Sequence, residues 1–320
     1  MQFEQMKETA NRLSSSIGKV IVGKQEVIEH LLVGIFAAGH VLLEDVPGTG
    51  KTMLAKALAK SMGGSAKRVQ FTPDLLPSDI TGIHYFNQKT SEFEFRPGPV
   101  FTNILLADEI NRATPRTQSS LLECMEERQV TIDGVTMPLE RPFLVIATQN
   151  PVENHGTYPL PEAQLDRFLI KTAMGYPEKD EAVQILKRFQ AENPLDQLEA
   201  VVRPEDIAVA QQRIGQVRVT DELFGYIVQL AEETRKHADV VHGVSPRGCQ
   251  SLLRASQACA VIRGGRDYVL PDDVKHMAAP VLSHRLVLNS QARMKGVTAG
   301  GIMEQVLGTV PVPVDHAYSR

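Results

Sequence analysis

The stretch His40-Val-Leu-Leu-Glu-Asp-Val-Pro-Gly-Thr-Gly-Lys-Thr52 joins a short apolar run to a glycine-containing loop and then to a helical pattern. The apolar run ends at Leu43 and predicts a buried strand, because it is short, branched and followed directly by turn residues. Residues 53–61 predict a helix with leucine and alanine side chains on one face. A loop in this position directs backbone N–H groups and the helix N-terminus towards an anion. The stretch therefore predicts a phosphate-binding loop.

The two residues that end this loop have separate expected roles. We expect Lys51 to contact the β- and γ-phosphates of a nucleotide and the Thr52 hydroxyl to ligate Mg²⁺. Asp45 replaces the first glycine of the common G-x-x-x-x-G-K-[ST] pattern, which puts an acidic residue at the start of a loop meant for phosphate. A glycine-rich turn with a chance Lys-Thr pair is the alternative interpretation. The residues expected to contact ATP are Val22, Gly23, Pro47, Gly48, Thr49, Gly50, Lys51, Thr52 and Met53.

Two carboxylates follow a second apolar run, at residues 103–107. This run predicts a buried strand that ends at the same edge of the sheet as the phosphate loop. We expect Asp108 to hold Mg²⁺ through its water shell and Glu109 to polarise the attacking water. A third apolar run, at residues 142–148, is followed by Asn150, which could orient the same water; the alternative for Asn150 is a turn residue before proline.

The bulk composition is that of an ordinary globular protein. The chain has 320 residues, of which 42% are hydrophobic and 22% charged, so it is long enough for two domains with separate cores. A net charge of −4 gives no overall electrostatic reason to expect nucleic acid or an anionic membrane. Three scattered cysteines predict thiols in a reducing cytoplasm rather than a disulfide framework. The N-terminus lacks the pattern of a signal peptide, and the longest apolar run, at residues 31–38, is far shorter than a membrane span.

The segment Gly175-Tyr-Pro177 is the predicted boundary between two domains. Residues 1–176 are expected to contain two N-terminal helices, further strands at 67–71 and 169–173, and two hairpins, at 81–99 and at 129–139 with a turn at Asp133-Gly134. Residues 177–320 are expected to be helical with a flexible C-terminal tail. The helices predicted there cover residues 178–190, 204–214, 221–237, 246–263 and 271–285.

Five motifs taken together resemble the MoxR family of AAA+ ATPases. They are Glu44-Asp-Val-Pro-Gly-Thr-Gly-Lys-Thr52, Leu106-Ala-Asp-Glu-Ile-Asn-Arg-Ala113, Ala147-Thr-Gln-Asn-Pro151, Leu160-Pro-Glu-Ala-Gln-Leu-Asp-Arg-Phe168 and Gly243-Val-Ser-Pro-Arg247. The resemblance covers most of the chain, and an aspartate in the position of Asp45 is usual in that family. It implies a P-loop NTPase of the α/β class, with a three-layer αβα domain around a parallel sheet and a smaller all-α lid domain.

The resemblance also implies a homo-oligomeric ring, usually hexameric, with ATP bound between subunits. By the same matching, Asn150 looks like the residue called sensor 1, and Arg247, at the start of a lid helix, looks like sensor 2. Arg167 looks like the arginine finger, which reaches the γ-phosphate of a neighbouring subunit. Arg112, Arg116 and Arg141 are the alternatives for that role, and a salt bridge to Asp166 or Glu162 is the alternative interpretation of Arg167.

The function implied by the resemblance is Mg²⁺-dependent ATP hydrolysis that drives chaperone-like remodelling, assembly or cofactor maturation of protein complexes. The expected partners are a protein client and a separate protein with a von Willebrand A domain. The hairpins at 81–99 and 129–139 are similar to the helix-2 insert of this clade and to the hairpin that precedes sensor 1, and both would face the central pore or the ring surface.

Three other functions remain open from the sequence. A nucleic-acid motor is disfavoured by the acidic balance and would show DNA-stimulated ATPase activity. The ATPase subunit of a magnesium chelatase would depend on a porphyrin-binding partner. A nucleotide-binding scaffold without hydrolysis would have no need of the water-activating carboxylate of Glu109.

Overall fold

A parallel sheet lies at the centre of the nucleotide-binding part of the chain, with helices packed against both of its faces. The computed structural model describes residues 1–46, 48–150, 156–191 and 193–313. The sheet has five strands in the order β2-β5-β8-β1-β9, and all neighbouring pairs are parallel. The strands are β1 (Val41–Glu44), β2 (Ala66–Gln70), β5 (Ile104–Asp108), β8 (Leu144–Gln149) and β9 (Ile170–Thr172). Each lies within two residues of a predicted strand.

The strand register brings the polar motifs to one edge of the sheet. Glu44 at the end of β1 is paired with Gln149 of β8, and Gln70 of β2 is paired with Asp108 of β5. The phosphate loop leaves β1 at this same edge. Because ligands of open α/β sheets bind outside the carboxyl ends of the strands, this edge is the expected position of a site.

Alternate side chains of the strands enter two apolar cores, one on each face of the sheet. On β1, Val41 and Leu43 enter the first core and Leu42 enters the second. The first core is covered by α1 (Phe3–Gly18), α2 (Gln25–Phe36) and α3 (Lys51–Ser61), and the second by α5 (Pro115–Glu127). These layers confirm the predicted αβα fold.

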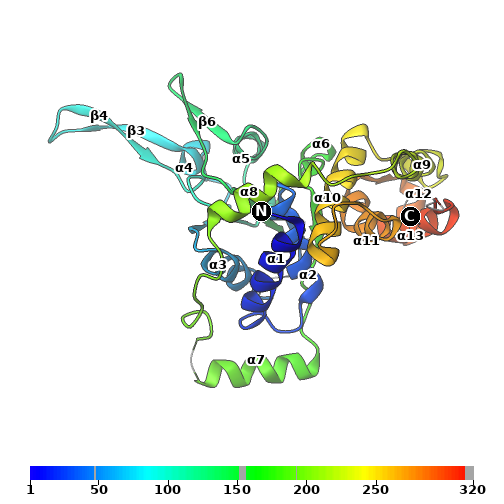
Figure 1. The fold of residues 1–320 in the computed structure, drawn as a ribbon. Coiled ribbons are helices and arrows are strands. Elements are labelled where there is room, and N and C mark those ends of the chain that lie inside the picture. The colour runs from blue at the N-terminus through cyan, green and yellow to red at the C-terminus, as the bar shows by residue number, and fades with distance from the viewer. Residues whose placement is uncertain (47, 151–155, 192, 314–320) are drawn as a thin grey trace.

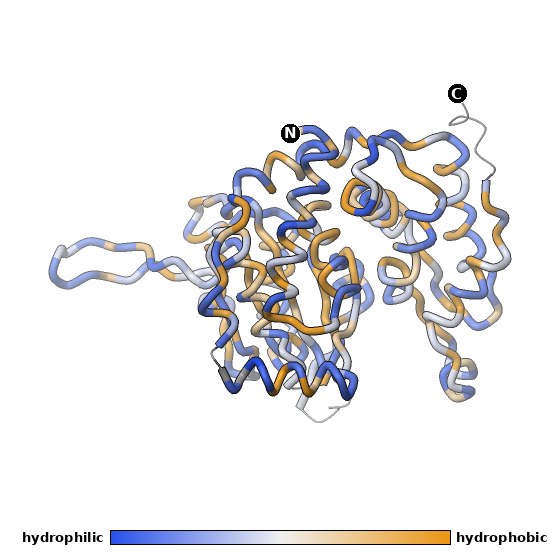
Figure 2. The backbone as a smooth tube through the Cα atoms, turned by 60° about the horizontal axis from the view of Figure 1, so that its bottom comes forward, coloured by the Kyte–Doolittle hydropathy of each residue, from blue (hydrophilic) through white to orange (hydrophobic). Residues whose placement is uncertain are grey.

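The two predicted hairpins are present, and both project from the same side of the molecule (Figure 1). One pairs β3 (Gly82–Asn87) with β4 (Glu92–Pro97), and the other pairs β6 (Gln129–Ile132) with β7 (Val135–Pro138). The short helix α4 (Pro77–Thr81) precedes the first hairpin, whose base is tight because a β-carbon on Gly98 would overlap the carbonyl oxygen of Ile80. In Figure 2 the β3–β4 hairpin stands well away from the body, at the left.

The chain after β9 is mainly helical. The five predicted helices are present as α7 (Lys179–Ala191), α8 (Pro204–Ile214), α9 (Asp221–Lys236), α10 (Pro246–Gly264) and α11 (Pro271–Leu282). The sequence analysis did not predict α12 (Ser290–Met294), α13 (Ala299–Thr309) or an antiparallel ribbon of β10 (Val240–His242) and β11 (Val287–Leu288). The lid is therefore helical with one short ribbon rather than purely helical. Of the predicted tail, residues 314–320 lie outside the described residues.

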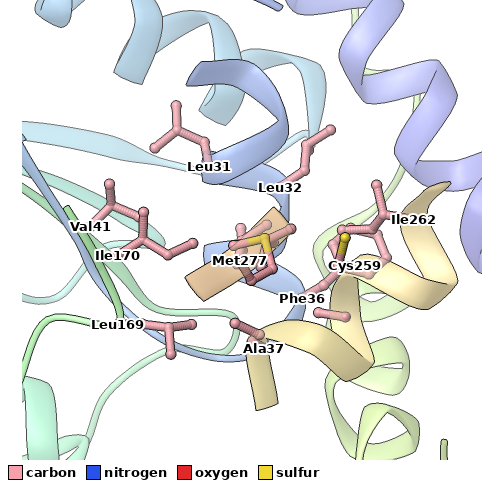
Figure 3. Close-up of a cluster of buried hydrophobic side chains, with 14 of the residues drawn as sticks. Leu31, Leu32, Phe36, Ala37, Val41, Leu169, Ile170, Cys259, Ile262 and Met277 are labelled. Atoms are coloured by element: carbon pink, nitrogen blue, oxygen red, sulfur yellow. The ribbon is translucent and has the colours of Figure 1, made fainter. Parts of the chain in front are cut away.

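The first apolar core continues from the nucleotide-binding part into the lid. Figure 3 shows Leu31, Leu32 and Phe36 of α2 near Cys259 of α10 and Met277 of α11. The division predicted between residues 176 and 177 thus crosses a continuous core, and it stays a prediction. Of the helices that the structure describes, none combines the length and the apolar character needed to span a bilayer.

Candidate nucleotide-binding and hydrolysis site

The phosphate loop between β1 and α3 has a backbone conformation that depends on its glycines. Gly48 has φ 84° and Gly50 has φ 92°, both in the left-handed region that residues with a β-carbon rarely adopt. Helix α3 begins at Lys51, directly after Gly50, so the unpaired N–H groups of its first turn adjoin the loop. This backbone suits an anion such as phosphate. Pro47 lies outside the described residues.

A cavity of about 630 Å³ lies over the loop and the carboxyl edge of the sheet. Of the residues predicted to contact ATP, those that line it are Val22, Gly48, Thr49, Gly50, Lys51, Thr52 and Met53. Gly23 is not among the lining residues; a β-carbon there would collide with the Glu181 carboxylate, so Gly23 packs against α7. The sequence analysis missed an apolar part of the wall, formed by Val20, Ile21, Met174, Pro177, Ile185 and Pro194.

Asp45, in the first place of the loop pattern, lines the cavity, but backbone N–H groups occupy both of its carboxylate oxygens. Its side chain is buried, with 6% exposed. One carboxylate oxygen accepts a hydrogen bond from the backbone N–H of Val46, at 2.8 Å. The other accepts from the N–H groups of Met174, at 3.1 Å, and Gly175, at 3.2 Å. The acidic residue therefore ties the start of the loop to the segment after β9 and leaves the cradle itself to the glycines.

Lys51 folds over the loop from the first turn of α3. Its Nζ donates to the carbonyl oxygens of Val46, at 2.8 Å, and Asp45, at 3.4 Å. The Thr49 hydroxyl donates to the same Val46 carbonyl, at 3.4 Å. The ammonium thus lies above the loop and lines the cavity, which is the position predicted for a group that binds phosphate.

Asp108 and Glu109 both line the cavity at the end of β5, and each is held by neighbouring strands. Asp108 accepts from the Thr148 hydroxyl at 2.6 Å, and its other carboxylate oxygen is 2.6 Å from Arg68 Nη2. Glu109 Oε2 accepts from Gln70 Nε2 at 2.8 Å and forms an ion pair with Arg112 Nε at 2.8 Å. The two carboxylates are therefore oriented by different partners, as their separate expected roles require.

Three of these partners were missed by the sequence analysis, namely Arg68, Gln70 and Thr148. No motif marks them, but the strand order does. Gln70 ends β2 and Arg68 lies two residues before it. Strand β2 adjoins β5, and Thr148 lies near the end of β8 on the other side of β5. Asn150 follows β8 and lines the cavity, where the sequence analysis places it.

The oxygen groups in the cavity suit Mg²⁺. This ion prefers oxygen ligands and commonly uses one or two protein carboxylates together with the phosphates of the substrate. The Thr52 hydroxyl and the Asp108 carboxylate both line the cavity, and no histidine or cysteine is among its described lining residues. The donor set therefore fits the ion, provided that Asp108 shares or exchanges its contact with Arg68 or Thr148.

Arg167 and Arg247 do not line this cavity; they meet each other on a different part of the surface. Arg167 Nε is 3.1 Å from one carboxylate oxygen of Glu126, and Arg247 Nη2 is 2.7 Å from the other. The alternative interpretation of Arg167 anticipated a salt bridge but named the wrong partners. Asp166 instead pairs with Arg285, at 2.7 Å.

The three competing arginines have different positions. Arg112 pairs with Glu109 beside the nucleotide cavity. Arg116 is exposed near the start of α5, and Arg141 is exposed before β8. Neither of these two adjoins Glu126 in a described ion pair.

Residues 40–170 match the family described as the ATPase family associated with various cellular activities, and residues 232–306 match an AAA lid domain. The chain is 52% identical over 304 residues to the uncharacterized protein YeaC of Bacillus subtilis, covering 95% of each protein. It is 42% identical over 321 residues to Chaperone MoxR1 of Mycobacterium tuberculosis, covering 98% of this chain and 84% of that protein.

A solved structure agrees over nearly the whole length. The crystal structure of a protein assigned as an ATPase from Cytophaga hutchinsonii superposes with a TM-score of 0.90 at 41% sequence identity, covering 97% of this chain and 96% of the other. The family matches, the end-to-end similarity to a MoxR protein and the geometry of the phosphate loop agree with one another. The chain belongs to the MoxR family of AAA+ ATPases and is an ATP-hydrolysing enzyme.

Proposed function

We propose that the chain is one subunit of a ring, expected to be a hexamer, that uses Mg²⁺-dependent ATP hydrolysis to remodel, assemble or mature protein complexes. The observation that carries this proposal is the division of the predicted site into two places. Lys51, Asp108 and Glu109 line one cavity, whereas Arg167 and Arg247 meet on Glu126 outside it. Because the two halves lie apart in one subunit, a second copy would complete each site in this proposal.

Within the cavity, the chain's own residues have the roles that the loop geometry supports. Lys51 would hold the β- and γ-phosphates, and Thr52 and Asp108 would hold Mg²⁺, which neutralises phosphate charge when bound. Glu109 would orient the attacking water and polarise it, with Asn150 beside it. Since Glu109 is bonded to Gln70 and Arg112, it must exchange one of these partners for the water before it can act.

The arginines supply the second half of the site in this proposal. Charge develops on the transferred phosphoryl group, and a guanidinium from a neighbouring subunit stabilises it. Arg167 is the proposed finger, and Arg247 of the lid would contact the same phosphate beside it. Their common contact with Glu126 supports a joint role, because it brings a residue of the nucleotide domain and a residue of the lid to one point.

The client contact is assigned to the β3–β4 hairpin. Tyr85, Phe86 and Phe93 on the β3–β4 hairpin are 41%, 52% and 74% exposed, on a segment that stands away from the body (Figure 2). Exposed aromatic clusters are typical of protein interaction sites. A separate von Willebrand A-domain protein as partner and a cytoplasmic location stay predictions.

A nucleic-acid motor and a magnesium-chelatase subunit are the alternatives. The projecting β3–β4 hairpin carries acidic as well as basic residues, such as Glu92, Glu94 and Arg96, which disfavours a phosphate backbone as its ligand. ATPase activity that rises with DNA would favour the motor, and activity that requires a porphyrin-binding partner would favour the chelatase.

We call the proposed arrangement, in which one subunit supplies the cavity and its neighbour supplies the arginines, the composite site. Mixing two inactive variants tests it. Lys51→Ala removes nucleotide binding from its own cavity, and Arg167→Ala removes the finger offered to the neighbour. Each variant alone should be nearly inactive, because an arginine supplied in trans is worth roughly 10³–10⁵ in rate in other phosphate-loop enzymes. Mixed rings should regain part of the activity, since some sites then pair an intact loop with an intact arginine.

A matched control is Arg218→Ala, which removes an exposed arginine that pairs with Asp267 and should leave activity unchanged. No recovery in samples where mixed assemblies demonstrably form would contradict the role of Arg167 in trans. Arg112, Arg116 or Arg141 would then be the predicted arginine that acts in trans.

A further inference from the structure

Glu126 joins two arginines that come from different parts of the chain. It lies in the last turn of α5, and its two carboxylate oxygens each take one guanidinium: Oε2 faces Arg167, which follows α6 (Glu162–Leu165), and Oε1 faces Arg247, in the first turn of α10. The distances are 3.1 Å and 2.7 Å, and the Glu126 side chain is 37% exposed. No motif of the sequence analysis includes this residue.

One side of Glu126 is cationic, whereas Glu123 and Glu127 line a second cavity with it on the other side. A cavity of about 220 Å³ is lined by Glu126 and Asp166 and also by Arg128, Arg167, Arg247 and Arg254. Burial, and then the charges of Arg254 and Arg141, lower the pKa of the Arg128 guanidinium. Because like charges repel, the Glu126 carboxylate between Arg167 and Arg247 lowers the cost of bringing the two guanidinium groups together.

The contacts leave donors for another ligand. Arg167 Nε forms an ion pair with Glu126, and Arg247 donates a hydrogen bond to it from Nη2. A guanidinium has five N–H donors in a planar fork, so neither arginine uses its whole fork on Glu126. The carboxylate can therefore hold both groups in place while their remaining N–H groups contact a phosphate.

The loop that carries Arg167 is fastened to the lid by a second set of contacts. Arg285, almost completely buried, donates from Nε to Asp166 at 2.7 Å and from Nη2 to the Phe168 carbonyl at 2.7 Å. Ser245, the N-cap of α10, donates its hydroxyl to Asp166 at 3.4 Å. Residues on both sides of Arg167 are thus held by the same lid that carries Arg247, which gives the two arginines one rigid support.

We propose that Glu126 is a positioning residue for hydrolysis in the neighbouring subunit, holding Arg167 and Arg247 as one cationic pair aimed at that neighbour's terminal phosphate. This inference rests on the proposed function, in which the two arginines act in trans. Glu126 itself need not touch the nucleotide. Its contribution is to cancel the repulsion between the arginines and to fix the direction of both forks.

Glu126→Gln is the informative substitution, because the amide keeps the size of the side chain but loses its charge. Hydrolysis should fall roughly 10- to 100-fold, since displacement of a positioning group by about 1 Å can cost about 10²-fold in rate. Binding of ATP by the variant's own loop, measured with a fluorescent ATP analogue, should be unchanged. Glu126→Asp keeps the charge with a shorter reach and should recover part of the loss.

The matched control is Glu127→Gln, which removes the adjacent exposed carboxylate of the same helix. It should hydrolyse ATP at the wild-type rate. Because the Glu126 side chain is on the helix surface, Glu126→Gln should unfold at the wild-type temperature. If the variant unfolds early, the comparison is made with Glu126→Asp, whose rate must then lie below that of wild type at unchanged ATP binding.

Mixing distinguishes a role in trans from a role in the variant's own site. Glu126→Gln mixed with Lys51→Ala should regain activity, because the Lys51→Ala subunit offers an intact arginine pair to the intact loop of the Glu126→Gln subunit. Glu126→Gln mixed with Arg167→Ala should regain none, because both lack the same half of the site.

The outcomes separate the two proposals. Recovery of Arg167→Ala with Lys51→Ala, but not of Glu126→Gln with Lys51→Ala, would overturn the role of Glu126 and leave the composite site intact. Wild-type hydrolysis by Glu126→Gln would overturn it as well. Failure of both mixtures in assembled samples would overturn the composite site, and the role of Glu126 with it.

Discussion

Glu109 shows at the scale of one residue how the site is built for hydrolysis. It has a left-handed backbone, with φ 56°, at the end of β5, and its carboxylate lines the nucleotide cavity. Glu109→Gln keeps the shape of the side chain and loses the charge that orients and polarises the water. We expect phosphate release to slow about 10²- to 10⁴-fold while ATP affinity, measured by calorimetry, stays at the wild-type value. Turnover near wild type would place the base elsewhere.

The control for this experiment is Glu44→Gln. Glu44 also ends a strand of the sheet, but it pairs with Lys171 and Gln149 and is not among the residues that line the cavity. Its removal should leave the hydrolysis rate unchanged.

Asp45 is predicted to matter for stability more than for phosphate contact. Asp45→Ala would leave three N–H groups without this acceptor, that of Met174 in a buried position and those of Val46 and Gly175 in partly buried ones. Each unsatisfied buried group costs about 1–3 kcal/mol, so thermal unfolding should occur several degrees lower than in wild type. Asp45→Asn, which retains an acceptor oxygen, should lose less. Equal melting temperatures for Asp45→Ala and wild type would show that these hydrogen bonds contribute nothing.

The buried His40 ring should make the free energy of unfolding depend on pH. Its Nδ1 accepts from the Val145 N–H and its Nε2 faces the Met125 carbonyl, so the neutral ring satisfies both partners. Burial, slightly opposed by the Met125 carbonyl, lowers its pKa to about 4 from 6.5. The unfolded chain therefore takes up a proton near pH 6.5 that the folded chain refuses until about pH 4, and the free energy of unfolding falls as the pH drops between these values.

The magnitude at pH 5 is about 2 kcal/mol relative to neutral pH, because one pKa unit corresponds to about 1.4 kcal/mol. Denaturant unfolding at pH 7.5 and pH 5 would measure it. His40→Gln should flatten this dependence, whereas His242→Gln, a change of an exposed histidine, should preserve it. An equally steep dependence in His40→Gln would contradict the prediction.

Among the elements, the β3–β4 hairpin carries the most direct prediction about the client. Phe86 packs edge-on against Phe93, with ring centroids 5.4 Å apart, and both rings stay exposed. Alanine at Tyr85 and Phe86 should leave basal ATPase activity intact and abolish client-dependent function, because the hairpin does not line the nucleotide cavity. Val135→Ala on the other hairpin, where Val135 is 56% exposed, is the matched control. Unchanged client activity in the aromatic variant would reduce the hairpin to a structural role.

Most elements could be predicted from the sequence, and the exceptions have a physical reason. Strands β1, β5 and β8 are continuous apolar runs, and the hairpins have alternating patterns with clear turns. Helix α13 lacks such a signal, because it begins Ala-Gly-Gly and glycine is a poor helix former. It forms because the Thr298 hydroxyl accepts from the Gly301 N–H at 3.1 Å, and because Ile302, Met303 and Val306 are buried against the lid. Tertiary packing outweighs local propensity there.

At the scale of the whole molecule, the sequence predicts one half of the candidate site better than the other. The phosphate loop, Asp108, Glu109 and Asn150 follow strands of one parallel sheet, so strand order alone brings them together. The meeting of Arg167 with Arg247 depends instead on how the lid packs on α2, through side chains such as Cys259 and Met277 (Figure 3). The spacing of the motifs along the sequence does not indicate how the lid packs. Without the structure, the contact of Glu126 with both arginines could therefore not be predicted.

The ATPase rate per subunit, measured as the subunit concentration is lowered, tests the composite site most directly. If each site needs an arginine pair from a neighbour, the rate per subunit should fall in parallel with the dissociation of the assembly observed by sedimentation. Saturating ATP and Mg²⁺ keep nucleotide binding constant across the series. A rate per subunit that stays constant in a population shown to be monomeric would contradict the account, because a single chain would then hydrolyse ATP with its own residues alone.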